Sequence, residues 1–212
     1  MTSVAASFVL PSVTCNATSN EEQEMYFFAS MDDLVTSSDF EYAGALAYCP
    51  QGSVTPFYYG IDTVNFVISA WTPSAGDIIY SNISVVSGNF VYNTTDVTTG
   101  QSMTVESSAA AASLNSAEIL TDTGNCGNAT VTVDCPLSNF GTVSFGSGHT
   151  GVAKTGFATI SGKTKGIGGF GTATSLYKGI TTNDAGTKVD ASTSGLTDHK
   201  SSFIVTFKHA GP

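Results

Sequence analysis

The chain has 212 residues, of which 41% are apolar and 11% charged, and its net charge of −10 includes no arginine. This balance argues against a nucleic-acid-binding protein, because phosphate contacts need basic side chains. No apolar run reaches the roughly 18 residues of a membrane-spanning helix, so no membrane span is predicted.

Strand-like segments follow one another along the whole chain at intervals of about 8–15 residues, separated by Gly, Asn, Pro and Ser. This rhythm predicts an all-β sandwich or barrel, as a single domain over residues 1–212. The run of alanines within Ser107–Ser116 is too short and uncapped for a helix, and the glycine-rich Gly146–Gly171 is expected to be a loop excursion. The predicted strands are Ser3–Leu10, Met25–Ala29, Gly52–Tyr59, Val64–Ala70, Asp77–Val86, Phe90–Asn93, Ser102–Glu106, Glu118–Thr121, Thr130–Val133, Thr142–Phe145, Phe157–Ile160, Thr172–Tyr177 and Ser202–Lys208.

The four cysteines allow three disulfide pairings. Cys126 and Cys135 bracket a short hairpin-like segment and are predicted to pair, which leaves Cys15 to pair with Cys49. Neither a CxxC pair nor a histidine cluster accompanies them, so neither a metal nor a cofactor is predicted. Four Asn-x-Ser/Thr sequons agree with an oxidising, glycosylating route and predict a secreted or cell-surface protein. The sequon asparagines are Asn16, Asn82, Asn93 and Asn128.

Charge is divided unevenly along the chain. All seven lysines and only three of the 17 acidic residues lie from Lys154 onward, so the first 153 residues carry −14 and the remainder +4. The division is compatible with a solvated acidic surface, and also with head-to-tail attraction between copies of the chain.

Several segments, in their order along the chain, resemble the eqolisins, a family of secreted glutamic peptidases. The resemblance implies two seven-stranded antiparallel sheets packed face to face in a jelly-roll or concanavalin-like sandwich, with a substrate groove on a concave sheet. The segments are Ser3–Val13, Tyr26–Asp32, Ala43–Gly44, Ser74–Asp77, Thr94–Ser102, Ser116–Leu120 and Asn139–Phe145.

The resemblance also implies a chemistry, in which a glutamate acts as general acid and base on a water and a glutamine amide stabilises the oxyanion. Glu118 matches the glutamate. The glutamine position, ten residues beyond Asp32, holds Tyr42. A phenol can donate a hydrogen bond in part replacement of the amide, or it can simply pack in the groove. The chain's three glutamines lie outside the motif: Gln23, Gln51 and Gln101.

Aromatic residues replace the tryptophans that the family has near its groove. Phe28 matches one such position, and Tyr58 or Tyr59 is expected at another. Asp32 is expected either to orient groove residues or to be an ordinary residue between strand and turn.

Eqolisins have an additional strand before the segment that matches Ser3–Val13, whereas this chain starts at Met1 within the second family strand. The resemblance therefore implies an unpaired sheet edge. Met1–Leu10 has no charged side chain and suits strand donation to another copy, which would build rings or filaments. A rearranged first strand that seals the edge within one chain is the alternative.

Three functions compete on these observations. The first is a non-catalytic extracellular glycoprotein on an eqolisin-like scaffold, as a surface or self-assembling subunit. The second is an acid endopeptidase with Glu118 as general acid and base. The third is a glycan-binding module that uses Tyr58, Tyr59 and neighbouring aromatic residues.

Overall fold

In the computed structural model, residues 1–32, 40–68, 70–110, 112–114, 116–124, 135–170 and 190–209 are described. They form two antiparallel sheets that pack against each other, which confirms the predicted β-sandwich. Within this part of the chain, no helix has the length and apolar character that crossing a membrane requires.

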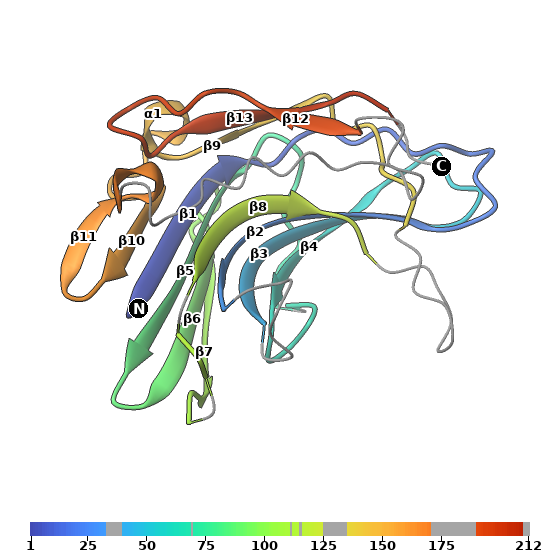
Figure 1. Ribbon diagram of the computed structural model, residues 1–212. Coiled ribbons are helices and arrows are strands. Elements are labelled where there is room, and N and C mark those ends of the chain that lie inside the picture. The colour runs from blue at the N-terminus through green and yellow to red at the C-terminus, as the bar shows by residue number, and fades with distance from the viewer. Residues whose placement is uncertain are drawn as a thin grey trace.

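The larger sheet has nine strands in the described residues, and these strands come from both the N-terminal and the C-terminal half of the chain. Its main path runs β12-β13-β9-β1-β5-β6-β7, and a β10–β11 hairpin pairs with the start of β1. Figure 1 shows this sheet bending from β12 and β13 at the top to β7 at the lower left. The strands are β1 (Ser3–Val9), β5 (Ile78–Val86), β6 (Asn89–Asp96), β7 (Gln101–Ser108), β9 (Thr142–Phe145), β10 (Phe157–Ile160), β11 (Lys163–Gly166), β12 (Ala191–Thr193) and β13 (Phe203–Phe207).

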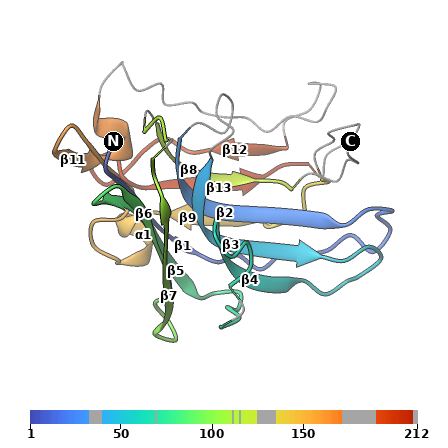
Figure 2. The ribbon, with the colours of Figure 1, turned by 90° about the horizontal axis from the view of Figure 1, so that it is seen from below.

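The smaller sheet has four described strands in the order β4-β3-β2-β8, and Figure 2 shows β2, β3 and β4 side by side. The family resemblance implied seven strands in each sheet; in the described residues the division is nine and four. The strands are β2 (Gln23–Met31), β3 (Glu41–Cys49), β4 (Phe57–Asp62) and β8 (Ala117–Asp122).

The core lies between the inner faces of the two sheets, where alternate residues of each strand meet. Phe8 of β1 contacts Phe27 of β2 and Phe145 of β9, with ring centroids 6.0 and 5.3 Å apart. The inner face of β3 carries three fully buried alanines at positions 43, 45 and 47, which leave room for the larger side chains of the facing sheet.

Strand β1 is paired on both sides within its own chain. All seven of its residues pair with β5, and on the other side its ends pair with β10 and β9. Donation of Met1–Leu10 to another copy would therefore first have to break these intramolecular pairs. The oligomeric state of the protein stays a prediction.

Four sequence-based expectations differ from the structure. The strand expected over Gly52–Tyr59 begins only at Phe57, after a turn in which the Ser53 N–H donates to the Pro50 carbonyl. The strand expected over Val64–Ala70 is not formed in its described residues, of which only Ile68 makes a single bridge, to Gly60. The Asp62 carboxylate accepts hydrogen bonds from Asn65 and closes a turn there instead.

The other two differences lie in segments that were expected to be irregular. Strand β3 was not predicted, since its alanines and glycine have low strand propensity. In the described part of Gly146–Gly171, the predicted strand Phe157–Ile160 is confirmed as β10, and the remainder is more regular than a loop, with the short helices α1 (Ser147–Thr150) and η1 (Ile167–Phe170) and the strand β11 that forms a hairpin with β10. Ser161 and Gly162 at its tip both have positive φ, as a two-residue hairpin turn requires.

The Cys15–Cys49 disulfide is confirmed, with Cα atoms 5.6 Å apart. It ties the segment after β1 to the end of β3. Cys126, Asn128 and the strands expected over Thr130–Val133 and Thr172–Tyr177 lie outside the described residues.

Candidate functional site

The candidate site is on the outer face of the four-stranded sheet, the face turned away from the core. Side chains alternate along a strand, and register partners on neighbouring strands point to the same face of the sheet. The pairing registers therefore identify which residues of the four strands lie on this face. The outer-face residues are Glu24, Tyr26, Phe28, Ser30, Tyr42, Gly44, Leu46, Tyr48, Phe57, Tyr59, Ile61, Glu118, Leu120 and Asp122.

Tyr42 and Glu118, the two residues proposed from the family chemistry, stand in one row across this face. Ser30 pairs with Tyr42 on one side and with Glu118 on the other, so the two are separated by a single strand. Neighbouring strands lie about 4.8 Å apart, which puts the two backbones roughly 10 Å from each other. The Ser30 hydroxyl is fully buried and donates a hydrogen bond of 3.4 Å to Glu118 Oε2.

Next to this row the outer face carries a packed aromatic cluster. Phe28 is a large apolar residue on an outer face, yet it is only 2% exposed. Gly44 stands opposite it, where a Cβ would lie 2.1 Å from the Phe27 carbonyl oxygen, so only glycine fits. The rings of Phe40 and Tyr42 cover Phe28, with centroids 5.6 and 5.9 Å from its own.

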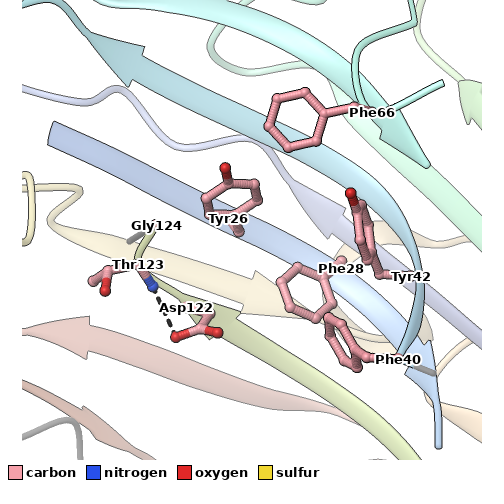
Figure 3. Close-up of a pocket in the computed structure, with 8 residues that line it drawn as sticks. All are labelled: Tyr26, Phe28, Phe40, Tyr42, Phe66, Asp122, Thr123 and Gly124. Carbon is pink, nitrogen blue, oxygen red and sulfur yellow. Dashed lines mark hydrogen bonds between the residues drawn. The ribbon is translucent and has the colours of Figure 1, made fainter. Parts of the chain in front are cut away.

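A hollow of about 190 Å³ opens beside this cluster (Figure 3). Figure 3 shows aromatic rings around it that come from β2, from β3 and from the turn after β4. Phe66 in that turn is 51% exposed and has φ +59°, an uncommon conformation for a bulky residue. Its N–H donates to the Asp62 carbonyl, which keeps the turn closed. The lining residues are Tyr26, Phe28, Phe40, Tyr42, Phe66, Asp122, Thr123 and Gly124.

Acidic side chains border the hollow on the side of Tyr26. Asp122 of β8 is the register partner of Tyr26, whose hydroxyl donates a 2.8 Å hydrogen bond to Glu24 Oε2. The Glu24 carboxylate also lies against Gly124, because a Cβ there would overlap it. Burial raises the pKa of Glu24 above its usual value; the hydrogen bond from Tyr26 opposes this shift, and Glu22 adds a smaller contribution in the same direction as burial.

The phenols around the hollow are held in their neutral form. Burial, followed by the hydrogen bond to Glu24, raises the pKa of Tyr26 far above its ordinary value. Burial also raises the pKa of Tyr42, with the carboxylates of Asp62 and Glu41 adding to the effect. Both residues therefore offer an O–H donor and an uncharged aromatic ring.

The other residues predicted for the groove do not line the hollow. Tyr58 faces the core, where its hydroxyl accepts from the Val13 N–H at 3.0 Å and donates to the Pro11 carbonyl at 3.2 Å. Tyr59 is on the outer face of β4, opposite Leu46 of β3, and is not among the residues that line the hollow. Asp32 is fully buried beyond the end of β2, where its N–H donates to the Ser116 carbonyl.

Sequence reasoning missed eight residues that the tertiary structure gathers here: Glu24, Tyr26, Ser30, Phe40, Phe66, Asp122, Thr123 and Gly124. The alternation Tyr26, Phe28, Ser30 was a readable signal for one strand. The contributions of β3, β8 and the turn after β4 depend on register, which a single sequence does not show.

The family of the chain follows from a comparison of its sequence with models of known families. The model of the peptidase A4 family matches residues 1–197. The chain belongs to the peptidase A4 family. This is the eqolisin family that the sequence resemblance indicated.

Solved structures of eqolisins share the fold of this peptidase A4 chain. SCP-B, an eqolisin in complex with the tripeptide Ala-Ile-His, is 16% identical with a TM-score of 0.69, and the match covers 98% of this chain and 92% of that chain. Scytalido-glutamic peptidase with a peptide-based transition-state analogue is 16% identical with a TM-score of 0.67 and the same coverages. Aspergilloglutamic peptidase from Aspergillus niger is 19% identical with a TM-score of 0.62, covering 90% of this chain and 100% of that chain. No curated protein sequence matches the chain.

The outer face of this chain differs in composition from what the family chemistry implied. The family chemistry implied a carboxamide at position 42, where this chain has a phenol whose ring packs against Phe28 and Phe40. None of the outer-face positions of the four described strands holds Asn or Gln. In the described residues, no group of three His, Cys, Asp or Glu side chains is placed to hold a metal ion.

Proposed function

We propose that this chain is a secreted, non-catalytic peptidase A4 family protein that binds an extended polypeptide on the outer face of its four-stranded sheet. The observation that carries the proposal is the side chain at position 42. Where the family chemistry uses an amide, Tyr42 contributes a ring to a packed aromatic cluster, 5.5 Å from Phe40 between centroids.

The physical reason is that peptide hydrolysis needs a donor aimed at the developing oxyanion. Removal of one such donor costs on the order of 10²–10³ in rate. A row with one carboxylate, one buried serine hydroxyl and a packed phenol retains a surface for binding but lacks the amide. Binding of a polypeptide is supported by the relatives of known structure, since SCP-B holds a tripeptide.

Secretion is supported by three features of the chain. It has a disulfide between Cys15 and Cys49, four sequons, and a surface chemistry in which hydroxyl side chains replace charged ones.

A second candidate function, an acid endopeptidase, is favoured by one contact. The Ser30 hydroxyl hydrogen-bonds Glu118, and Tyr42 stands in the same row, so a proton-transfer group and a phenolic donor share one face. One experiment separates the two functions. Unfolded protein substrates are incubated at acid pH with the wild type and with Glu118→Gln, and new peptide termini are counted by mass spectrometry.

We expect both proteins to show the same background cleavage, because no amide supports the transition state. Tyr42→Phe is the matched control for any role of the phenol as a donor. Cleavage by the wild type that disappears in Glu118→Gln would reject the non-catalytic proposal and establish the endopeptidase.

A further inference from the structure

The hollow beside Tyr42 combines three properties that together select one class of ligand. It is lined mainly by aromatic rings, it has carboxylates at one side, and it is small. At about 190 Å³ it is below the range of roughly 300–1,000 Å³ that is usual for whole small-molecule ligands. It therefore suits a single side chain better than a cofactor or an oligosaccharide unit with its several hydroxyls.

The rings favour a cation. An aromatic face carries negative charge density and attracts an ammonium or guanidinium group within about 6 Å of its centroid. Tyr26, Phe28, Tyr42 and Phe66 border the hollow from different directions (Figure 3). Because burial raises the pKa of both tyrosines, their rings remain neutral phenols.

The charges next to the hollow favour a cation as well. Asp122 lines it, and Glu24 is tied to the lining residues Tyr26 and Gly124. No lysine, arginine or histidine occurs in β2, β3, β4 or β8, so the charged side chains of these four strands are all acidic. The first 153 residues carry −14, and the lysines of the described residues belong to the later part of the chain, such as Lys163 and Lys165 of β11.

We propose that this hollow binds the cationic side chain, lysine or arginine, of the extended polypeptide that lies on the outer face of the sheet. The inference rests on the proposed polypeptide-binding function and adds the residue class that is recognised. The aliphatic stem lies across the ring of Tyr42, and the charged end points to the side of Glu24 and Asp122. A cation there would stabilise the Glu24 carboxylate, which burial has partly separated from water.

The experiment uses blocked pentapeptides of the form Gly-Gly-X-Gly-Gly, in which X is lysine, arginine, acetyllysine or norleucine. Each is titrated into the ¹⁵N-labelled full chain, and dissociation constants come from amide chemical shifts. We expect the lysine and arginine peptides to bind at least about fivefold more tightly than the acetyllysine and norleucine peptides, as a cation–π site would. Raising the salt concentration should narrow this difference, because it screens the carboxylates.

Variants locate the site. Tyr42→Leu should weaken binding of the lysine peptide at least about threefold, whereas Tyr42→Phe keeps the ring and should stay within about twofold of the wild type. Glu24→Gln with Asp122→Asn should weaken only the cationic peptides. Tyr48→Leu, on the same strand and face but outside the hollow, is the matched control and should change nothing.

Three results would overturn the proposal: equal affinity for the lysine and acetyllysine peptides, no binding of the lysine peptide at millimolar concentration, or preferential binding of a neutral oligosaccharide such as cellopentaose. Equal affinity would remove the cation preference and leave polypeptide binding in place. Cleavage that depends on Glu118 would instead reject the non-catalytic function, and the affinity ratios would still report on the cation site.

Discussion

At the scale of single residues, the site depends on one pair across two strands. Phe28 can be buried on an outer face only because Gly44, its register partner on β3, has no side chain. Phe40 and Tyr42 then close over the ring. The absence of a side chain at Gly44 thus allows the Phe28 ring to form the floor of the hollow.

Gly44→Ala should therefore destabilise the protein. The new Cβ would lie 2.1 Å from a backbone oxygen, which cannot move as a side chain could. We expect the free energy of unfolding to fall by about 1–3 kcal/mol, the usual cost of overpacking, in urea denaturation followed by circular dichroism. Gly195→Ala is the control, because no atom lies within 4 Å of its new Cβ. An unchanged urea midpoint for Gly44→Ala would show that the sheet relaxes around the methyl group.

At the scale of elements, the outer face of the nine-stranded sheet holds two sequons in direct opposition. Asn82 of β5 and Asn93 of β6 are register partners, and each is half-buried. Cβ atoms of such partners lie about 4.5–5.5 Å apart. Asn93 Nδ2 also donates a 2.9 Å hydrogen bond to Thr104 of β7, so its amide is already engaged in the folded sheet.

We expect that a glycosylating host modifies at most one of these two asparagines in any one molecule, because two glycans cannot leave the sheet side by side at this spacing. Mass spectrometry of a single peptide spanning both residues measures this directly. Asn16, which is exposed, provides the reference site in the same preparation. A substantial population that carries glycans on both Asn82 and Asn93 would contradict the expectation.

At the scale of the whole molecule, buried phenols tie stability to alkaline pH. Burial is the main reason that the pKa values of Tyr26, Tyr42, Tyr80 and Tyr92 lie above the ordinary value, and these residues belong to both sheets. A folded-state pKa above the unfolded value means that the folded chain holds its protons longer. This part of the stability is complete below the unfolded pKa of about 10 and is lost as the pH rises toward the folded values.

The free energy of unfolding should accordingly decline steeply above pH 10. Tyr80→Phe should reduce the slope of this decline, because burial alone raises the pKa of Tyr80 and its hydroxyl makes no hydrogen bond to the described part of the chain that the substitution would break. Urea denaturation at several pH values between 9 and 12, with tyrosinate absorbance followed in parallel, tests both statements. A slope that is the same in Tyr80→Phe would assign the alkaline loss to other groups.

The sequence by itself determined the all-β class, the Cys15–Cys49 disulfide and the family. These depend on the local alternation of apolar and polar residues, on cysteine spacing and on the order of motifs, all of which are visible in the linear sequence. It also indicated Tyr42 and Glu118, which the structure places in one row.

Only the tertiary structure decided which strands meet. Strand β3 owes its place to the space between two sheets, where alanines fit although their strand propensity is low. For strand β1, donation to another copy and pairing within its own chain were both open, and the structure pairs it on both sides within its own chain. The hollow joins residues that lie far apart in sequence, from Tyr26 to Gly124. The physical reason is that alternation is a local property, whereas register and sheet order arise from pairing between distant segments, and a shift of one residue would turn each of these side chains to the opposite face.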